Sequence, residues 1–387
     1  MTDSSIYDQI AACVKSDDRV TAVNQLIEHL DSQKLYHEQF EALKMRMRLE
    51  LGLTPAQAEN EDRLDEETEL KIERGLLDAC RVIAGKFFQQ GNIREGWMYM
   101  RPVGDRQEAA KALQSIEPNE ENVDEFLEVL LHEGVDIRRG YQLALKQLGT
   151  CNSITMFESA LAARPRSDQE IAAELLVHHV HGELLENLQR DIEQRESNAP
   201  AESTLAELLA ARPDLLKDGT YHLDTSHIAS TVRFARVLND EPSLQLALDI
   251  ATYGLKLHPQ FQYPGEEPFL DLYPASVAFF RALLGQQVDQ GIRYFSQKAD
   301  TLNPEEQGTV AIEVLIDLLS RCGRQEDALA NFHKRLPPGC RTMGIAPSLL
   351  QISQRLGNFD SMIDVCKQRE DLLGYAAAIL QAPEKSA

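Results

Sequence analysis

Five of the ten histidines in this chain fall between residues 174 and 238, in two short runs. In the first run, His178 and His181 are one helical turn apart, so both imidazoles could bind the same metal ion. The second run contains His222, Asp224 and His227, which could complete the coordination shell. Glu174 precedes the first run by one turn and could be a further ligand or could orient one. These six residues are therefore the candidate ligand-binding or metal-binding residues.

Imidazole and carboxylate ligands together suit Zn²⁺, Fe²⁺ or Mn²⁺. If one coordination position stayed open, a bound water would become acidic enough to act as a nucleophile, which would make the protein a metal-dependent hydrolase. The spacing is not His-Glu-x-x-His and lacks the carboxylate pattern of di-iron bundles. Two other interpretations remain open. The histidines could form a buried polar network, or they could line a metal-free pocket for an acidic or peptide ligand.

Two expected helices would position these residues. On a helical wheel, six residues of 168–192 fall in one stripe that the leucines mark as core-directed: Ile171, Glu174, His178, His181, Leu185 and Leu188. A second helix over 225–238 places His227 on the same stripe as Thr231 and Leu238. Asp224 or Thr225 stands where the N-cap of that helix would be, and capping is the commonest single role for an aspartate there. Arg233 and Arg236 could line an anion site, although surface ion pairs are their usual role.

Composition excludes several classes of function. The 62 acidic and 39 basic residues give a net charge of −23, which disfavours nucleic acid and anionic membrane surfaces as partners. No apolar stretch approaches the length that spans a bilayer, and residues 1–8 do not resemble a secretory signal. The six cysteines are scattered without a Cys-x-x-Cys pair, which is typical of a reduced, cytoplasmic protein.

Nearly every segment has the 3.6-residue period of an amphipathic helix, so the fold class is predicted to be all-α. Helices break repeatedly at a glycine, at Gly91, Gly285, Gly323 and Gly357. A smaller residue follows each break five or six positions later, and a large or apolar residue follows four positions after that. A glycine in the left-handed conformation ends a helix, and a small residue lets the two helices of a hairpin approach each other. A second half-pattern, Ser153-x3-Phe157-x2-Ala160-Leu161-x3-Pro165, closes a helix on proline and recurs in part from Ala247 to Pro259.

This skeleton of glycine, small residue, aromatic residue and proline resembles degenerate tetratricopeptide repeats. The resemblance covers patches near residues 80–101, 150–165, 240–259 and 275–370. It implies a right-handed α-solenoid of stacked antiparallel helical hairpins and a protein or peptide bound on its concave surface. The first helix of each hairpin departs from the family, for example at Ile316 and Ser353. We therefore do not expect the family's peptide-carboxylate clamp.

The expected organisation is one continuous array: N-terminal helices at 1–62, helical repeats at 63–165, a histidine-containing helical insertion at 166–238, and further helical repeats at 239–387. The sequence favours a scaffold or adaptor that binds a protein or peptide. The alternative is a metal-dependent hydrolase, or a metal or ligand sensor, with its site in the histidine stretch.

Overall fold

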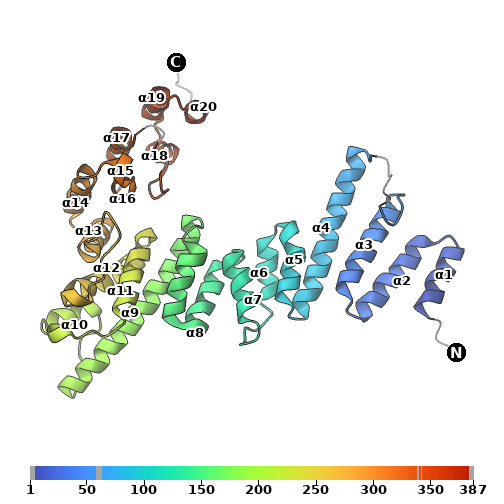
Figure 1. Ribbon diagram of the computed structural model, residues 1–387, viewed down its shortest axis with the longest axis horizontal. Helices are drawn as coiled ribbons and strands as arrows, with labels where there is room; N and C mark the ends of the chain where they lie inside the picture. The colour runs from blue at the N-terminus through green and yellow to red at the C-terminus, as the bar shows by residue number, and fades with distance from the viewer. Residues whose placement is uncertain (1–4, 58–62, 338–339, 341, 383–387) are drawn as a thin grey trace. The chain divides into compact units, whose positions relative to one another are not determined.

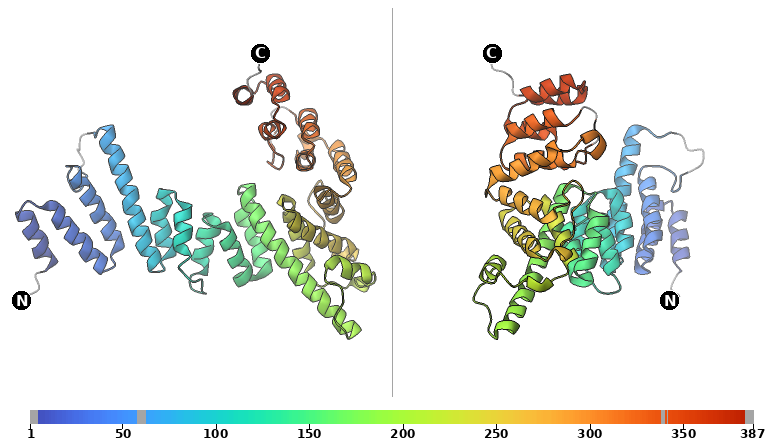
Figure 2. Two further views of the ribbon diagram at one scale, coloured as in Figure 1. Left: turned by 180° about the vertical axis from the view of Figure 1, so that it is seen from behind. Right: turned by 60° about the vertical axis from the view of Figure 1, so that its left-hand side comes forward.

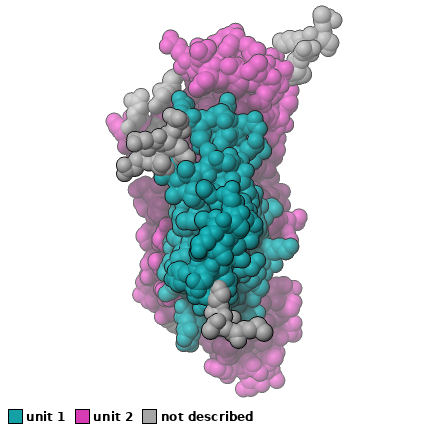
Figure 3. Space-filling view, turned by 90° about the vertical axis from the view of Figure 1, so that its right-hand side faces the viewer, with its two compact units in different colours: residues 1–147 teal, residues 148–387 magenta. Residues whose placement is uncertain are grey.

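A computed structural model describes residues 5–57, 63–337, 340 and 342–382 of the chain. All regular secondary structure in this part is helical, with no strand, as the sequence predicts (Figure 1). The chain divides into two compact units, residues 1–147 and 148–387 (Figure 3). No helix among the described residues is both long and apolar enough to span a bilayer. Residues 1–4 and 58–62 of the expected N-terminal segment, and residues 383–387 of the last one, lie outside the described residues.

The first unit contains these elements, up to the first part of α8: α1 (Ile6–Lys15), α2 (Arg19–Ser32), α3 (Tyr36–Glu50), α4 (Glu66–Gln89), α5 (Ile93–Val103), α6 (Arg106–Leu113), α7 (Val123–Leu127), the π-helical turn η1 (Glu128–His132) and α8 (Ile137–Met156). From α1 to α5, each helix packs against the next along the chain. One of its core clusters is built around Tyr36, Leu43, Ile83 and Phe87. The helix α8 is interrupted at Gly149, whose φ is 75°, next to the division between the units.

The second unit continues with these elements: η2 (Phe157–Leu161), α9 (Arg166–Glu196), α10 (Leu205–Ala211), η3 (Lys217–Gly219), α11 (Thr225–Phe234), η4 (Ala235–Val237), α12 (Glu241–Lys256), η5 (Pro259–Phe261), α13 (Leu272–Leu283), α14 (Val288–Asp300), α15 (Pro304–Gln307), α16 (Val310–Arg321), α17 (Gln325–Arg335), α18 (Leu349–Leu356), α19 (Asp360–Gln368) and α20 (Leu372–Gln381). The long helix α9 packs against α11 and α12 (Figure 2). Beyond α12, successive helices pack in the order α13, α14, α16, α17 and α18, and α19 packs against α20.

The predicted hairpin geometry is confirmed at the glycine breaks. All four glycines, Gly91, Gly285, Gly323 and Gly357, have a left-handed φ between 67° and 81°. The small residue that follows is needed for close packing, because a Cβ built on Gly96 would lie 2.5 Å from the ring of Phe88. Further along the second helices, Met100, Phe295 and Cys366 are buried. The two predicted helices of the histidine stretch are also present, as α9 and as α11 with the 3₁₀ turn η4.

Candidate functional site

The first histidine run lies on α9. The predicted inward stripe is wrong for His178, which is exposed, and right for Leu188, which is buried. The residues that the helix buries are Ala172, Ala173, Leu176, Val177, Val180, Leu184, Leu188 and Ile192. The prediction took its direction from leucines and isoleucine and gave no weight to the alanines, which allow neighbouring elements to approach closely. Since α11, α12, η2 and η4 all contact α9, the buried surface has turned away from His178. His178 is exposed, and its Nε2 lies 3.3 Å from Ser243 Oγ on α12.

The other two histidines of this run have separate partners. His179 Nε2 lies 3.0 Å from Thr150 Oγ1 and 3.4 Å from Glu183. His181 Nε2 lies 3.7 Å from Asp249 Oδ2 on α12 and is buried without a hydrogen-bond partner among the described residues. His179 thus links α9 to Thr150 of α8, and His181 faces Asp249 of α12.

His222 forms a third, separate cluster. Its ring is buried between Asp191 Oδ2, 2.9 Å from Nε2, and Tyr253 OH, 3.0 Å from Nδ1. Its main-chain N–H donates to the same Tyr253 oxygen at 2.8 Å. A hydrogen on Nε2 would be donated to Asp191, and the Tyr253 oxygen accepts the main-chain N–H. Burial raises the pKa of Asp191, but the hydrogen bonds from His222 and Arg195 outweigh it and hold that pKa below its usual value.

The remaining predicted ligands have their own positions. Asp224 is the N-cap of α11, and its side chain accepts hydrogen bonds from Ser226 N at 2.8 Å and Ser226 Oγ at 2.6 Å. His227, in the first turn of α11, is half-buried. Glu174 is half-buried beside His178 and has a bonding partner of its own. N-capping of α11 therefore explains the presence of Asp224.

The six candidate residues do not converge on one point. His222 contacts α9 at Asp191, which is 13 residues beyond His178, or about 20 Å along a helix. No group of three or more His, Cys, Asp or Glu side chains in the described part of the chain is arranged to hold a metal ion. The hypotheses of a zinc, iron or manganese site and of a hydrolase built on it thus find no supporting geometry.

The structure instead forms a cavity of about 690 Å³ in the second unit. Its walls come from the start of α9, the 233–237 segment, the 266–272 loop, α13, α16 and the 343–345 segment. Apolar side chains such as Phe269, Phe279 and Val314 line it together with four arginines, Arg164, Arg166, Arg233 and Arg236. This volume is in the range of sites for small organic ligands. Sequence analysis had identified Arg233 and Arg236 as possible anion-site residues, but it had not connected them with α9 or α16.

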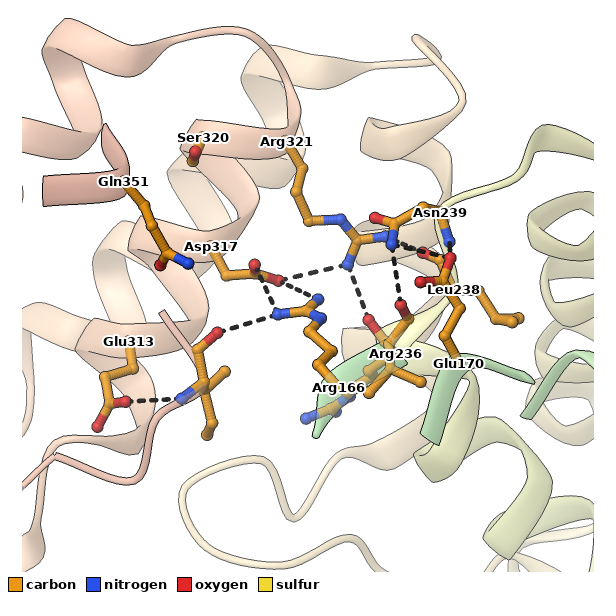
Figure 4. Close-up of polar contacts among 12 residues, drawn as sticks. Arg166, Glu170, Arg236, Leu238, Asn239, Glu313, Asp317, Ser320, Arg321 and Gln351 are labelled. Atoms are coloured by element: carbon orange, nitrogen blue, oxygen red, sulfur yellow. Dashed lines mark hydrogen bonds and ion pairs between the residues drawn. The ribbon is translucent and has the colours of Figure 1, made fainter. Parts of the chain in front are cut away.

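Asp317 on α16 is the buried centre of a charge network beside the cavity (Figure 4). Its two oxygens accept from Arg166 NH1 at 2.9 Å and NH2 at 3.0 Å, which is the two-pronged geometry favoured by arginine and carboxylate. Arg321 also donates to Asp317, at 3.3 Å, and to the main-chain oxygens of Arg236 and Leu238. Burial lowers the pKa of Arg321, against the effect of Asp317. The network joins α9, α16 and the segment after α11.

Glu313, one turn before Asp317 on the same helix, is almost fully buried and holds the 343–345 segment. Its carboxylate accepts from Met343 N at 2.8 Å, from Ile345 N at 2.9 Å, and from the Thr309 hydroxyl. Arg166 NH1 donates to Ile345 O at 3.0 Å. The cavity wall formed by this segment is therefore fixed through main-chain hydrogen bonds to two charged side chains.

Arg236 differs from the other arginines of the cavity. Its Nε is buried without a hydrogen-bond partner in the described part of the chain, and no described carboxylate forms an ion pair with it. Its guanidinium carbon lies 5.0 Å from the centre of the Phe269 ring. Burial lowers the pKa of Arg236 to about 10, although Tyr294, Glu266 and Asp271 partly oppose this. An unpaired cation in such a place is costly and is often found at functional sites.

A separate feature of the second unit is the apolar outer face of α20. Leu372, Leu373 and Leu380 are 77%, 85% and 84% exposed, and Ile379 is also exposed. On a helix these residues and Ala376 fall within one stripe of about 120°. The opposite face, which includes the buried Ala378, packs against α18 and α19. The helix thus exposes its most apolar side, which is typical of an interaction surface.

Comparison of the chain with protein-family models, with curated proteins and with solved structures gives no match.

Proposed function

We propose that this protein is a cytoplasmic scaffold or adaptor that binds a protein or peptide partner. In this proposal the helical hairpins stack as a right-handed, tetratricopeptide-like solenoid. The repeated left-handed glycines support it, as do the buried small and large residues that follow them in the second helices. The cytoplasmic location is supported by the six cysteines, which are all free thiols.

The observation that carries the proposal is the exposed apolar stripe of α20. Exposing three leucines on one helix is unfavourable in water, since burying each of them would contribute about 1.5–3 kcal/mol. A partner that presents an apolar helix face would bury them in the manner of a helix pair. The partner is therefore another protein with an amphipathic helix, and this helix binds to the exposed face of α20.

The negative charge of the chain indicates which residues should border the apolar face of the partner helix. Four exposed carboxylates lie on α19 or immediately before α20, namely Asp360, Asp364, Glu370 and Asp371. The chain as a whole carries −23. An acidic surface accelerates association with a basic partner and disfavours an acidic one. We therefore expect lysine or arginine residues beside the apolar face of the partner helix, and binding that weakens as salt rises.

Capture experiments with the full chain test this proposal. Wild-type protein would be compared with Leu372→Asp/Leu380→Asp and with Tyr7→Asp, a matched control because Tyr7 is a similarly exposed apolar residue, 80% exposed, on a different helix, α1. The expected result is a partner that the wild type and the Tyr7 variant retain, that the α20 variant loses, and that binds directly when purified. Equal capture by all three proteins would contradict the proposal. A dimer of the purified chain that the α20 substitutions dissolve would show that a second copy covers this face, which would also contradict it.

A further inference from the structure

We propose that the cavity beside Arg236 binds a small molecule that carries one carboxylate on an apolar body, such as an aryl-alkanoic or medium-chain aliphatic acid. The carboxylate would lie against the Arg236 guanidinium, and the apolar body would fill the rest of the cavity. The inference concerns a different surface from α20 and does not depend on the proposed partner.

The need for an anion follows from the state of Arg236. Arg236 is half-buried, and its Nε is buried with no acceptor among the described residues, an unfavourable arrangement that a paired carboxylate would relieve. No described residue supplies one. The nearby Asp271 is already occupied by Lys298 Nζ at 2.8 Å and by the Tyr294 hydroxyl. A ligand carboxylate could accept two parallel hydrogen bonds from the fork of Arg236.

The proposal that the ligand has a single negative charge follows from the other arginines of the cavity. Arg164 pairs with Asp168 at 2.9 Å, and Arg166 pairs with Asp317. Arg233 pairs with Glu266 at 2.8 Å and with Glu158. Among the described arginines that line the cavity, Arg236 is therefore the one without a carboxylate partner. Glu267 also lines the cavity and would repel a second negative charge on a phosphate or a dicarboxylate.

The apolar body follows from the walls. Phe269 and Phe279 contribute aromatic surface, and Leu272, Val310 and Val314 contribute aliphatic surface. Glu313 and Arg166 hold the Met343–Ile345 wall in place, so the site is formed before a ligand arrives. Burying apolar surface in such a preformed cavity supplies most of the affinity, while the single charged contact orients the ligand.

Binding of matched acids and amides tests the inference. Benzoate, 4-phenylbutyrate and octanoate, each beside its primary amide, would be titrated by calorimetry into wild type, Arg236→Met, Arg236→Lys and Arg293→Met. Arg293 is an exposed arginine of α14 and serves as the control. At least one acid should bind wild type and Arg293→Met about tenfold or more tightly than its amide, because a hydrogen bond to a charged group contributes about 1.5–3 kcal/mol. Arg236→Met should abolish this preference, and Arg236→Lys should retain part of it, because lysine keeps the charge without the fork.

The stability of the free variants provides a second readout. If Arg236 is uncompensated, Arg236→Met should have a Tm no lower than that of wild type, because the methionine removes a buried charge and keeps most of the volume. A purely structural arginine would give the opposite result. The inference is overturned if no acid binds more tightly than its amide, if Arg236→Met keeps the preference, or if this variant loses several degrees of Tm or does not fold.

Discussion

Arg166 and Asp317 are 151 residues apart in the sequence, yet the two guanidinium nitrogens of Arg166 lie 2.9 and 3.0 Å from the two carboxylate oxygens of Asp317. This ion pair joins the first turn of α9 to the middle of α16, and both of its residues line the cavity. Its energetic role follows from the burial of Asp317, which is 4% exposed.

Replacing Asp317 with alanine should destabilise the second unit. The substitution leaves Arg321 buried without its carboxylate and releases Arg166, so we expect a loss of about 3 kcal/mol in the free energy of unfolding. Asp289→Ala is the matched control, because Asp289 pairs with Arg324 at the surface, where a pair contributes less than about 1 kcal/mol. Urea unfolding of the full chain, followed by circular dichroism, would measure both. Similar losses in the two variants would contradict the importance of the buried network.

Replacing Glu313 with glutamine should loosen the 343–345 segment. The amide keeps one acceptor oxygen but turns an NH₂ group toward a main-chain N–H, so at least one charge-assisted hydrogen bond is lost. We expect a loss of about 1–3 kcal/mol and faster amide exchange at Met343 and Ile345, measured by hydrogen–deuterium exchange. Glu326→Gln on the exposed side of α17 should leave both amides unchanged. Unchanged exchange in the Glu313 variant would show that other contacts hold the segment.

The Asp191–His222 pair should make the thermal stability of the protein depend on pH in the acid range. Because the folded-state pKa of Asp191 is lowered, its contribution to stability is fully present above the unfolded value of about 3.9. That contribution is lost as pH falls through the lower folded value. Asp191→Asn should therefore flatten the dependence of Tm on pH below about 4. The control is Asp214→Asn, because Asp214 is exposed and pairs with Lys217 at the surface, and this variant should keep the wild-type slope. If Tm depended on pH in the same way for wild type and Asp191→Asn, the proposed contribution of Asp191 to acid stability would be refuted.

Two glycines of the second unit should respond oppositely to alanine. A Cβ on Gly254 would lie 2.1 Å from the ring of Tyr273, whereas a Cβ on Gly182 would meet nothing within 4 Å. Gly254→Ala should cost about 1–3 kcal/mol through overpacking. Gly182→Ala should stabilise α9 by about 0.5–1 kcal/mol, because alanine loses less backbone entropy. Thermal unfolding of the two variants measures the contrast, and equal shifts in Tm would contradict the close packing of α12 against α13.

Local patterns in the sequence determined the helices and their ends. The all-helical class, the extent of α9, the cap at Asp224 and the left-handed turns at Gly91 and Gly323 were all predictable. Each depends on residues within one or two turns of the same segment: a periodic apolar face, a side chain that accepts from a nearby N–H, or a glycine without a Cβ.

Only the tertiary structure decided which faces meet. The sequence directed His178 inward, but α9 is contacted by several elements at once, and their arrangement turned this residue to the surface. The sequence also showed Arg236 as one more arginine beside Arg233. Arg236 is left unpaired among the described residues because the carboxylates near it have other partners, Lys298 for Asp271 and Arg233 for Glu266. Those pairings depend on contacts between distant segments, for which local spacing contains no information.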